Sequence, residues 1–368
     1  MRKNPNKMNS YETGPIRPPS EAGSYLIRLT RGCPWNKCKF CRTYRKLAFE
    51  IRDTAEVLAD IDAMARIRDD IKSGKPVVNE YRWMVENALS RGGTTAFLQD
   101  GDSLAMKPDA VRHILAHLQE RLPEITRITS YARSRTMASR SVSDLASYRE
   151  LGLTRIHIGM ESGHDPLLQV IKKGATSDIH IRGGKQVIEA GIELSEYIMP
   201  GLGGREFTKG HALDSARVLN EIGPDFIRLR TICLGPTIPL WEEFSSGKLT
   251  RLTDIEIVKE IRNFIEALNV DGSKLASDHT LNLLGELDGK LPNDKERLLA
   301  IVDIFLSLPK EERELFQVAR RAGILEKLSD LDHQKVQIHA RKLLDEIYRH
   351  YGKDGVEEAT QEMMKRFI

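Results

Sequence analysis

Strand-like and helix-like segments alternate about six times along the first two thirds of the chain, a pattern typical of parallel strands joined by helices. Apolar runs that end in polar tips lie at 94–103, 125–133, 154–162 and 192–204, and segments with helical spacing separate them. We therefore predict an α/β fold, an open partial (β/α)6 barrel of the TIM type with a C-terminal helical extension. In such barrels the functional side chains lie at the carboxyl ends of the strands.

Three regions follow from this pattern. Residues 1–22 are polar and contain four prolines, so we predict a lead-in segment without its own core. Residues 23–240 would form the barrel. Residues 241–368 would form a mainly helical extension, with helices expected at 279–287, 295–308, 310–323 and 332–367.

Charge and hydropathy exclude several classes of protein. The 368 residues include 56 Lys and Arg against 53 Asp and Glu, a net charge of +3, which argues against a nucleic-acid partner. No run of 18 apolar residues exists, so we expect no transmembrane helix. The first residues lack the apolar stretch of a secretory signal, and we expect a cytoplasmic protein.

Three of the four cysteines lie within nine residues, at Cys33, Cys38 and Cys41, in a loop directly after the first predicted strand. Clustered thiolates suit an iron–sulfur cluster or zinc. A structural zinc site needs a fourth Cys or His ligand, and none follows within a compact finger. On a [4Fe–4S] cluster, three thiolates leave one iron open. We predict the cluster, with zinc as the alternative, and Cys233 as a buried thiol in a strand over 225–235.

At this point the sequence resembles the radical S-adenosylmethionine (SAM) superfamily, over roughly residues 22–240. The resemblance rests on the C-x4-C-x2-C motif, with Phe40 as the aromatic residue before Cys41. The usual spacing in the family is one residue shorter between the first two cysteines. The resemblance implies a [4Fe–4S] cluster on Cys33, Cys38 and Cys41, with SAM as its partner.

The resemblance also assigns SAM-binding positions to the tips of the later strands. The segment Gln99-Asp100-Gly101-Asp102 stands where the family has a glycine-glycine-glutamate motif for the SAM amino group. Ser130, Tyr131 and Arg133 stand at the tip associated with the ribose. Lys173 matches a basic position that binds the SAM carboxylate in the family. The glycine-rich segment that contains Met199 and Gly201 matches the segment that contacts the adenine. The remaining implied positions are Glu161 and Ser162.

The implied reaction is reductive cleavage of SAM to methionine and a 5′-deoxyadenosyl radical, which removes hydrogen from a substrate. We expect an oxygen-sensitive enzyme, a small-molecule substrate and a low-potential electron donor of the flavodoxin or ferredoxin type. The alternatives are a radical SAM enzyme that modifies tRNA or peptides, a non-enzymatic carrier of heme or another cofactor, and, more remotely, a zinc-binding structural protein.

Two further groups are candidate substrate-binding and catalytic residues. Arg228 and Arg230 alternate along a predicted strand, so both face one side, where a carboxylate or phosphate of the substrate would bind them. Asp278 and His279 would touch substrate or pass a proton, or would instead cap a helix over 279–287. The segment 178–183 fits a cobalamin-ligating pattern, but we interpret it as a helix start with His180 on the surface.

Overall fold

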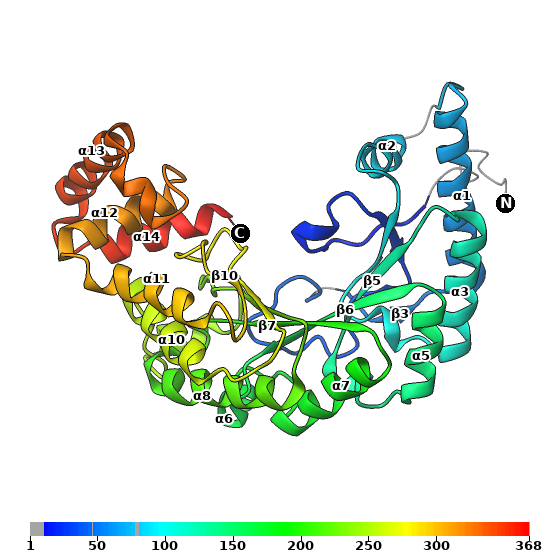
Figure 1. Cartoon of the computed structure of the whole chain (residues 1–368), viewed down its shortest axis with the longest axis horizontal. Coiled ribbons are helices and arrows are strands. Elements are labelled where there is room, and N and C mark those ends of the chain that lie inside the picture. Colours follow the sequence, from blue (N-terminus) through cyan, green and yellow to red (C-terminus); the bar gives the residue numbers. More distant parts are fainter. Residues whose placement is uncertain (1–10, 46, 78–80, 368) are drawn as a thin grey trace. The chain divides into compact units, whose positions relative to one another are not determined.

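The computed structural model describes residues 11–45, 47–77 and 81–367. The chain divides into two compact units, which are described separately here. Unit 1 comprises residues 1–159 and 182–195, and unit 2 comprises residues 160–181 and 196–368. Figure 1 labels many of the helices and some of the strands of both units.

Unit 1 holds the first strands and their connecting helices. Its elements are η2 (Pro19–Glu21), β1 (Tyr25–Arg28), β2 (Thr30–Arg31), β3 (Glu50–Ile51), α1 (Thr54–Lys72), α2 (Arg82–Ser90), β4 (Thr95–Gln99), η3 (Ser103–Ala105), α3 (Pro108–Arg121), β5 (Arg127–Ala132), α4 (Ser134–Met137) and α5 (Val142–Glu150). Three elements contain residues of both units, namely β6 (Leu153–Glu161), α7 (Ser177–Glu189) and β7 (Glu193–Ile198).

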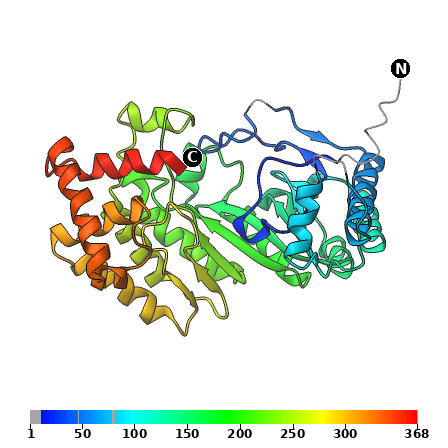
Figure 2. The ribbon, with the colours of Figure 1, turned by 90° about the horizontal axis from the view of Figure 1, so that it is seen from above.

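Unit 2 holds the later strands and the helical C-terminal part. Its elements are α6 (Asp165–Val170), α8 (Gly204–Ile222), β8 (Phe226–Leu229), α9 (Trp241–Ser245), α10 (Asp254–Ala267), β9 (Lys274–Ala276), β10 (Asp288–Lys290), α11 (Lys295–Ser307), α12 (Lys310–Arg321), η4 (Leu328–Asp332), α13 (Gln334–Tyr351), α14 (Val356–Met364) and η5 (Lys365–Phe367). Helices α11 to α14 are the orange and red elements in Figure 2.

The strands of unit 1 are parallel neighbours in the order β1-β4-β5-β6. The middle of β4 is fully buried at Ala96, Phe97 and Leu98, as expected of a strand covered on both faces. Helices α1, α3 and α5 follow one another along one side of this unit (Figure 1), and α3 contacts both of the others. Helix α1 begins where the Asp53 carboxylate accepts the backbone N–H of Ala55.

In unit 2, β8 and β9 are parallel, and β10 returns antiparallel to β9. Helix α10 contacts α8 and α11. It begins with a capping box in which Thr253 and Glu256 satisfy each other's backbone N–H groups. The predicted α/β fold with parallel strands and a helical C-terminal part is confirmed.

Three local predictions are wrong. The segment 279–287 is not a helix but a run of turns between β9 and β10. The side chain of Asn282 hydrogen-bonds to the backbone of Leu229 and Thr231, and these contacts hold the segment in a non-helical conformation. The strand predicted over 225–235 ends at Leu229, whose carbonyl oxygen accepts the Asn282 amide, so Cys233 lies in the segment after β8 and is partly exposed rather than buried. His180 is fully buried because it lies on the apolar face of α7, seven residues before the buried Val187.

No helix in the described part of the chain combines the length and the apolar character that crossing a membrane requires.

Candidate functional site

The three clustered cysteines lie in the loop between β2 and β3 of unit 1. Cys33, Cys38 and Cys41 are each partly exposed. The Arg45 guanidinium braces the loop by donating to the carbonyl oxygens of Cys41 at 3.0 Å and Cys38 at 2.6 Å. Within residues 11–45, 47–77 and 81–367, no three Cys, His, Asp or Glu side chains are gathered closely enough to hold a metal ion. The three thiols therefore share one braced loop without a preformed coordination geometry.

Asn36 shapes the middle of the same loop. Its backbone is left-handed, with φ of 46°, which is uncommon for a residue other than glycine. Its side-chain amide donates to the carbonyl oxygens of Tyr44 at 2.6 Å and Leu47 at 3.2 Å. These bonds tie the first half of the loop to its second half. Phe40, the aromatic residue before the third cysteine, is half-buried in the loop.

The tip of β4 contacts the cysteine loop through Asp100 and Gly101. Asp100 Oδ2 accepts the backbone N–H of Gly32 at 3.2 Å, and Asp100 Oδ1 accepts the Tyr44 hydroxyl at 3.1 Å. A Cβ atom on Gly101 would lie 3.0 Å from Cys33 Cβ, so glycine permits this close approach. Burial raises the pKa of Asp100, although the charge of Arg28 opposes that effect.

The other two predicted residues of the β4 tip have partners within unit 1. Gln99 is buried and its amide bonds the backbone of the N-terminal segment, accepting the N–H of Gly14 at 2.7 Å. Asp102 is also buried, and its carboxylate accepts the Thr136 hydroxyl and the backbone N–H of Arg133. Burial raises the pKa of Asp102 to about 6 despite the hydrogen bond from Thr136. Their predicted role toward SAM stays a prediction.

The tip of β5 also meets the cysteine loop. The guanidinium of Arg133 lies over the Trp35 ring, 5.7 Å from its centre, as a cation–π pair. Tyr131 packs edge-on against Phe97 at 5.1 Å, and the Ser130 hydroxyl donates to the carbonyl oxygen of Tyr131. Unit 1 therefore brings the predicted residues of β4 and β5 and the cysteine loop into one neighbourhood.

In unit 2, Lys173 and Glu161 are direct partners. Lys173 Nζ donates to Glu161 Oε1 at 3.1 Å, across the 12 residues that separate them in sequence. Glu161 has a left-handed backbone with φ of 67°, and its carbonyl oxygen accepts the N–H of Met199 at 3.0 Å. The end of β6 and the glycine-rich segment after β7 are thus joined by a backbone hydrogen bond.

Glu196 is a functional candidate that the sequence reasoning missed. It lies on β7 with its side chain fully buried, and neither carboxylate oxygen has a hydrogen-bond partner among the described residues. Burial raises its pKa well above the usual range, and the charge of Glu161 adds to this effect while that of Lys173 opposes it. An acidic residue among the apolar positions of 192–198 was the available signal.

Arg228 and Arg230 share one carboxylate at the end of β8. Arg228 Nη1 donates to Asp278 Oδ2, and Arg230 Nη1 donates to Asp278 Oδ1 at 2.5 Å. Arg230 also lies over the Tyr197 ring, 4.8 Å from its centre. Burial alone would raise the pKa of Asp278, but the charges of Arg230 and Arg228 outweigh it and lower the pKa. The predicted residues of this group therefore lie together.

His279 follows Asp278 and is partly buried beside the two arginines. Burial, and then the charge of Arg230, lowers its pKa to about 4. No helix begins here for Asp278 to cap, so the capping interpretation is wrong. Asn282 fixes the neighbouring segment, because its side-chain oxygen accepts both the N–H and the hydroxyl of Thr231 at 2.9 Å.

Comparison with known proteins identifies the class. A family model described as the Radical SAM superfamily matches residues 27–209, which include the three clustered cysteines and both predicted SAM-binding segments of unit 2. The chain contains a radical SAM domain over residues 27–209. No curated protein sequence matches the chain.

Three solved structures illustrate the structural similarity. An Elp3 from the archaeon Methanocaldococcus infernus is 15% identical, with 66% of this chain and 57% of that chain covered and a TM-score of 0.42. Methylornithine synthase is 13% identical, with coverages of 85% and 86% and a TM-score of 0.43. Coproporphyrinogen III oxidase from Escherichia coli is 12% identical, with coverages of 66% and 52% and a TM-score of 0.47. The chain thus spans little more than half of the first and third proteins.

Radical SAM enzymes bind a [4Fe–4S] cluster and SAM. The residues of this chain fit that pair of cofactors in their chemistry. Cys33, Cys38 and Cys41 would supply three soft thiolate donors from one loop and would leave one iron open to SAM. Glu161 and Lys173 supply an anion and a cation that suit the ammonium and carboxylate of an amino acid.

Proposed function

We propose that this radical SAM enzyme acts on a small molecule that carries a carboxylate or phosphate, bound by Arg228 and Arg230. The observation that carries this proposal is the sharing of Asp278 by both guanidinium groups. Two positive charges against one negative charge leave a local excess of one positive charge. An anionic group of the substrate would neutralise that excess.

The surroundings of the two arginines strengthen the attraction for an anion. Their side chains are only 11% and 14% exposed, so water screens their charges weakly. Arginine presents paired N–H groups that match the two oxygens of a carboxylate or phosphate. Arg228 Nε is buried and has no hydrogen-bond partner among the described residues, so it retains a donor.

His279 is the proposed proton acceptor of this group. Its pKa of about 4 means that the imidazole is neutral near pH 7, and its one lone pair, on Nδ1, accepts the backbone N–H of Leu281 at 3.4 Å. The charge of Arg230 contributes to that low pKa, so a substrate anion paired with Arg230 would raise the proton affinity of His279. Binding of the anion would therefore prepare the imidazole to take up a proton.

The remaining residues would hold the cofactors. The cluster and SAM, when bound, supply the low-potential electron and the radical that abstracts hydrogen from the substrate. Cys33, Cys38 and Cys41 would hold the cluster, while Lys173 and Glu161 would bind the charged groups of the amino-acid part of SAM. We propose a flavodoxin or ferredoxin as the electron donor and a cytoplasmic location.

The test starts with anaerobic reconstitution of the full chain with iron and sulfide. The holoprotein should absorb near 400 nm, as [4Fe–4S] proteins typically do, and should release 5′-deoxyadenosine from SAM when reduced with dithionite. The release is then measured with matched pairs of metabolites, each pair comprising a carboxylate- or phosphate-bearing compound and its neutral amide or ester.

The proposal predicts that only charged members of the pairs increase 5′-deoxyadenosine release, and that the double variant Arg228→Gln/Arg230→Gln loses this response while it keeps the cluster. A neutral compound that stimulates the wild type as strongly as its charged partner would contradict the anionic substrate. A colourless zinc protein, or a holoprotein that binds heme without cleaving SAM, would contradict the enzymatic function itself.

A further inference from the structure

His211 on α8 reaches the ends of two strands in unit 2. It is 1% exposed, and its Nδ1 lies 2.9 Å from Ser162 Oγ, directly after β6. Its Nε2 lies 3.1 Å from the carbonyl oxygen of Met199, directly after β7. A carbonyl oxygen can only accept, so Nε2 carries a proton and donates it. One imidazole therefore joins the residue after Glu161 to the start of the glycine-rich segment.

Ser215, one turn further along α8, reinforces the first of these contacts. Its hydroxyl oxygen accepts the backbone N–H of Gly163 at 2.8 Å, and Ser162 Oγ accepts the N–H of His164 at 3.1 Å. Residues four apart lie on the same face of a helix, so His211 and Ser215 act on the segment together. The turn after β6 is thereby fixed to α8 at two points.

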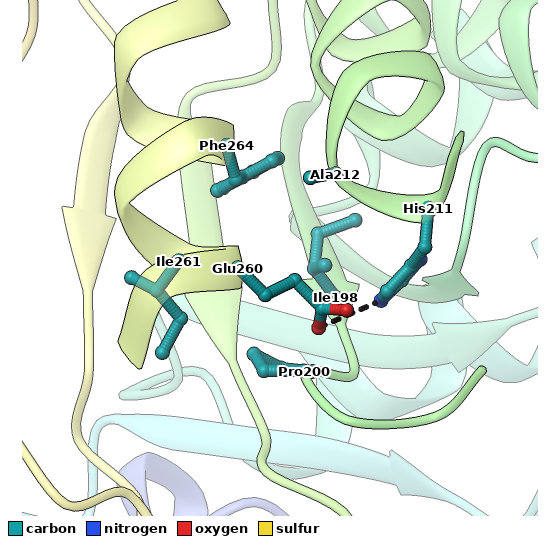
Figure 3. Close-up of a pocket in the computed structure, with 7 residues that line it drawn as sticks. All are labelled: Ile198, Pro200, His211, Ala212, Glu260, Ile261 and Phe264. Atoms are coloured by element: carbon teal, nitrogen blue, oxygen red, sulfur yellow. Dashed lines mark ion pairs between the residues drawn. The ribbon is translucent and has the colours of Figure 1, made fainter. Parts of the chain in front are cut away.

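Glu260 on α10 holds the glycine-rich segment from the other side. Its Oε1 accepts the backbone N–H of Gly201 at 2.8 Å and lies 3.8 Å from His211 Nε2. Figure 3 shows the two side chains pointing toward each other. The other residues that line this small cavity are apolar: Ile198, Pro200, Ala212, Ile261 and Phe264.

The Glu260 carboxylate is 3% exposed in these apolar surroundings, and its Oε2 has no hydrogen-bond partner among the described residues. A buried carboxylate that is only partly bonded lowers stability. A functional role of its contacts with Gly201 and His211 would explain why a carboxylate stands at this buried position.

Both segments contain a residue with a left-handed backbone. Gly201 has φ of 82°, and a Cβ atom there would lie 3.1 Å from Ile257 Cδ1 on α10. Glu161 has φ of 67° although it carries a side chain. Glycine adopts a positive φ without strain, whereas for Glu161 such a conformation persists only when neighbouring contacts fix it. His211 and Glu260 supply those contacts at the residues next to Glu161 and at Gly201 itself.

We infer that His211 and Glu260 are positioning residues of the SAM site, which hold Glu161–Ser162 and Met199–Gly201 in their binding conformation. The inference rests on the proposed function, because the superfamily resemblance assigns both segments to SAM. Both residues lie beyond residue 209, where the family match ends. Helix α10 thus contributes the positioning residue Glu260 to the SAM site in addition to packing against the strands.

The experiment compares Glu260→Leu, Glu260→Gln and His211→Leu with the control variant Ile261→Val, which removes one methylene from the same cavity. The first measurement is amide hydrogen exchange at residues 199–204 in protein without cluster or SAM. The second is the dissociation constant for SAM of the reconstituted protein.

We expect Glu260→Leu to exchange faster at Gly201, and both leucine variants to bind SAM at least about 10-fold more weakly, a change of about 1.4 kcal/mol. Glu260→Gln keeps an oxygen that can accept the Gly201 N–H, so it should stay close to the wild type in both measurements. Ile261→Val should leave both unchanged.

The outcomes separate this inference from the proposed function. A wild-type holoprotein that carries the cluster but binds no SAM contradicts the proposed function before any variant is considered. Wild-type SAM affinity in both leucine variants, or unchanged exchange at Gly201 in Glu260→Leu, overturns the positioning role. If the leucine variants do not fold, Glu260→Gln decides, because a 10-fold loss of SAM affinity there contradicts the hydrogen-bond argument.

Discussion

Arg28 at the end of β1 and Asp100 after β4 form an ion pair, with Arg28 Nε 2.7 Å from Asp100 Oδ2. The Asp100 side chain is fully buried and that of Arg28 is 11% exposed. The same carboxylate accepts the N–H of Gly32, the residue before the first cysteine. The pair therefore connects two neighbouring strands to the start of the cysteine loop.

Replacement of Asp100 by Asn should loosen the cysteine loop. The variant loses the charge that pairs with Arg28, and breaking one side of a buried ion pair costs about 3 kcal/mol. We expect a lower melting temperature of the cluster-free protein and less iron per chain after reconstitution, measured by calorimetry and iron analysis. Tyr44→Phe, which removes only the 3.1 Å hydroxyl contact with Asp100, should show a smaller loss. Equal iron content in wild type and Asp100→Asn would show that the pair does not support the loop.

We expect three of the four cysteines to be required for the cluster and the fourth to be dispensable. Cys33→Ala, Cys38→Ala and Cys41→Ala should each abolish the absorbance near 400 nm after reconstitution, because a three-thiolate site cannot lose a ligand and hold the cluster. Cys233→Ala should keep it, since that residue lies outside the loop, in the segment after β8. Loss of the cluster in Cys233→Ala would overturn the ligand assignment.

Glu196→Gln should stabilise the protein more at high pH than at low pH. The pKa of Glu196 is raised in the folded state, so the unfolded chain releases the proton first as the pH rises above about 4.3. Between the two pKa values the folded state binds more protons, and the stability of the wild type falls with rising pH. We expect the melting temperature of the variant to exceed that of the wild type by at least about 2 °C at pH 8 and by less at pH 4.

Glu193→Gln is the matched control for this measurement. Glu193 lies on the same strand, but its side chain is 47% exposed and pairs with Arg155. It should show no gain in stability that grows with pH. The same melting-temperature difference for Glu196→Gln at pH 4 and pH 8 would contradict a raised pKa.

Arg230→Gln should raise the pKa of His279 from about 4 toward its ordinary value, because the charge of Arg230 is one cause of the lowered pKa. Asp278→Asn should lower it further, because the Asp278 charge acts in the opposite direction. Nuclear magnetic resonance titration of the His279 ring protons measures both shifts. An unchanged pKa in Arg230→Gln would show that burial alone sets the titration of His279.

The same pKa predicts how stability depends on pH. The unfolded chain takes up a proton at His279 near pH 6.5, whereas the folded chain does so near pH 4. Stability should therefore fall as the pH decreases from 6.5 to 4, and His279→Gln should show a smaller fall. Denaturant titrations at pH 7 and pH 4.5 compare the two proteins.

The sequence predicts the alternation of strands and helices because buried strands and amphipathic helices each leave a periodic pattern. The superfamily resemblance assigns Glu161 and Lys173 to SAM separately, and the structure adds that the two side chains are direct partners. The helix expected over 279–287 fails because the contacts of Asn282 with Leu229 and Thr231 override the local apolar pattern. Only tertiary structure supplies those contacts.

His211 and Glu260 could not be found in this way. Each is a polar residue on a helix, and a polar residue on a helix is usually exposed to solvent. Their importance comes from contacts with Ser162, Met199 and Gly201, which are 49, 12 and 59 residues away in the chain. Contacts over such distances leave no periodic trace in the sequence.

Four residues other than glycine have a positive φ in the described chain, namely Asn36, Asp100, Glu161 and Lys172. The first three lie in the cysteine loop or in segments predicted to bind SAM, and Lys172 directly precedes the predicted residue Lys173. A left-handed backbone costs an L-residue roughly 1–2 kcal/mol. Glycine at Asn36, Asp100 or Glu161 would relieve that cost but would also remove the side-chain contacts that these residues make. At Asp100 the loss of the buried ion pair with Arg28, about 3 kcal/mol, would exceed that gain, so the left-handed residue is also the more stable choice there.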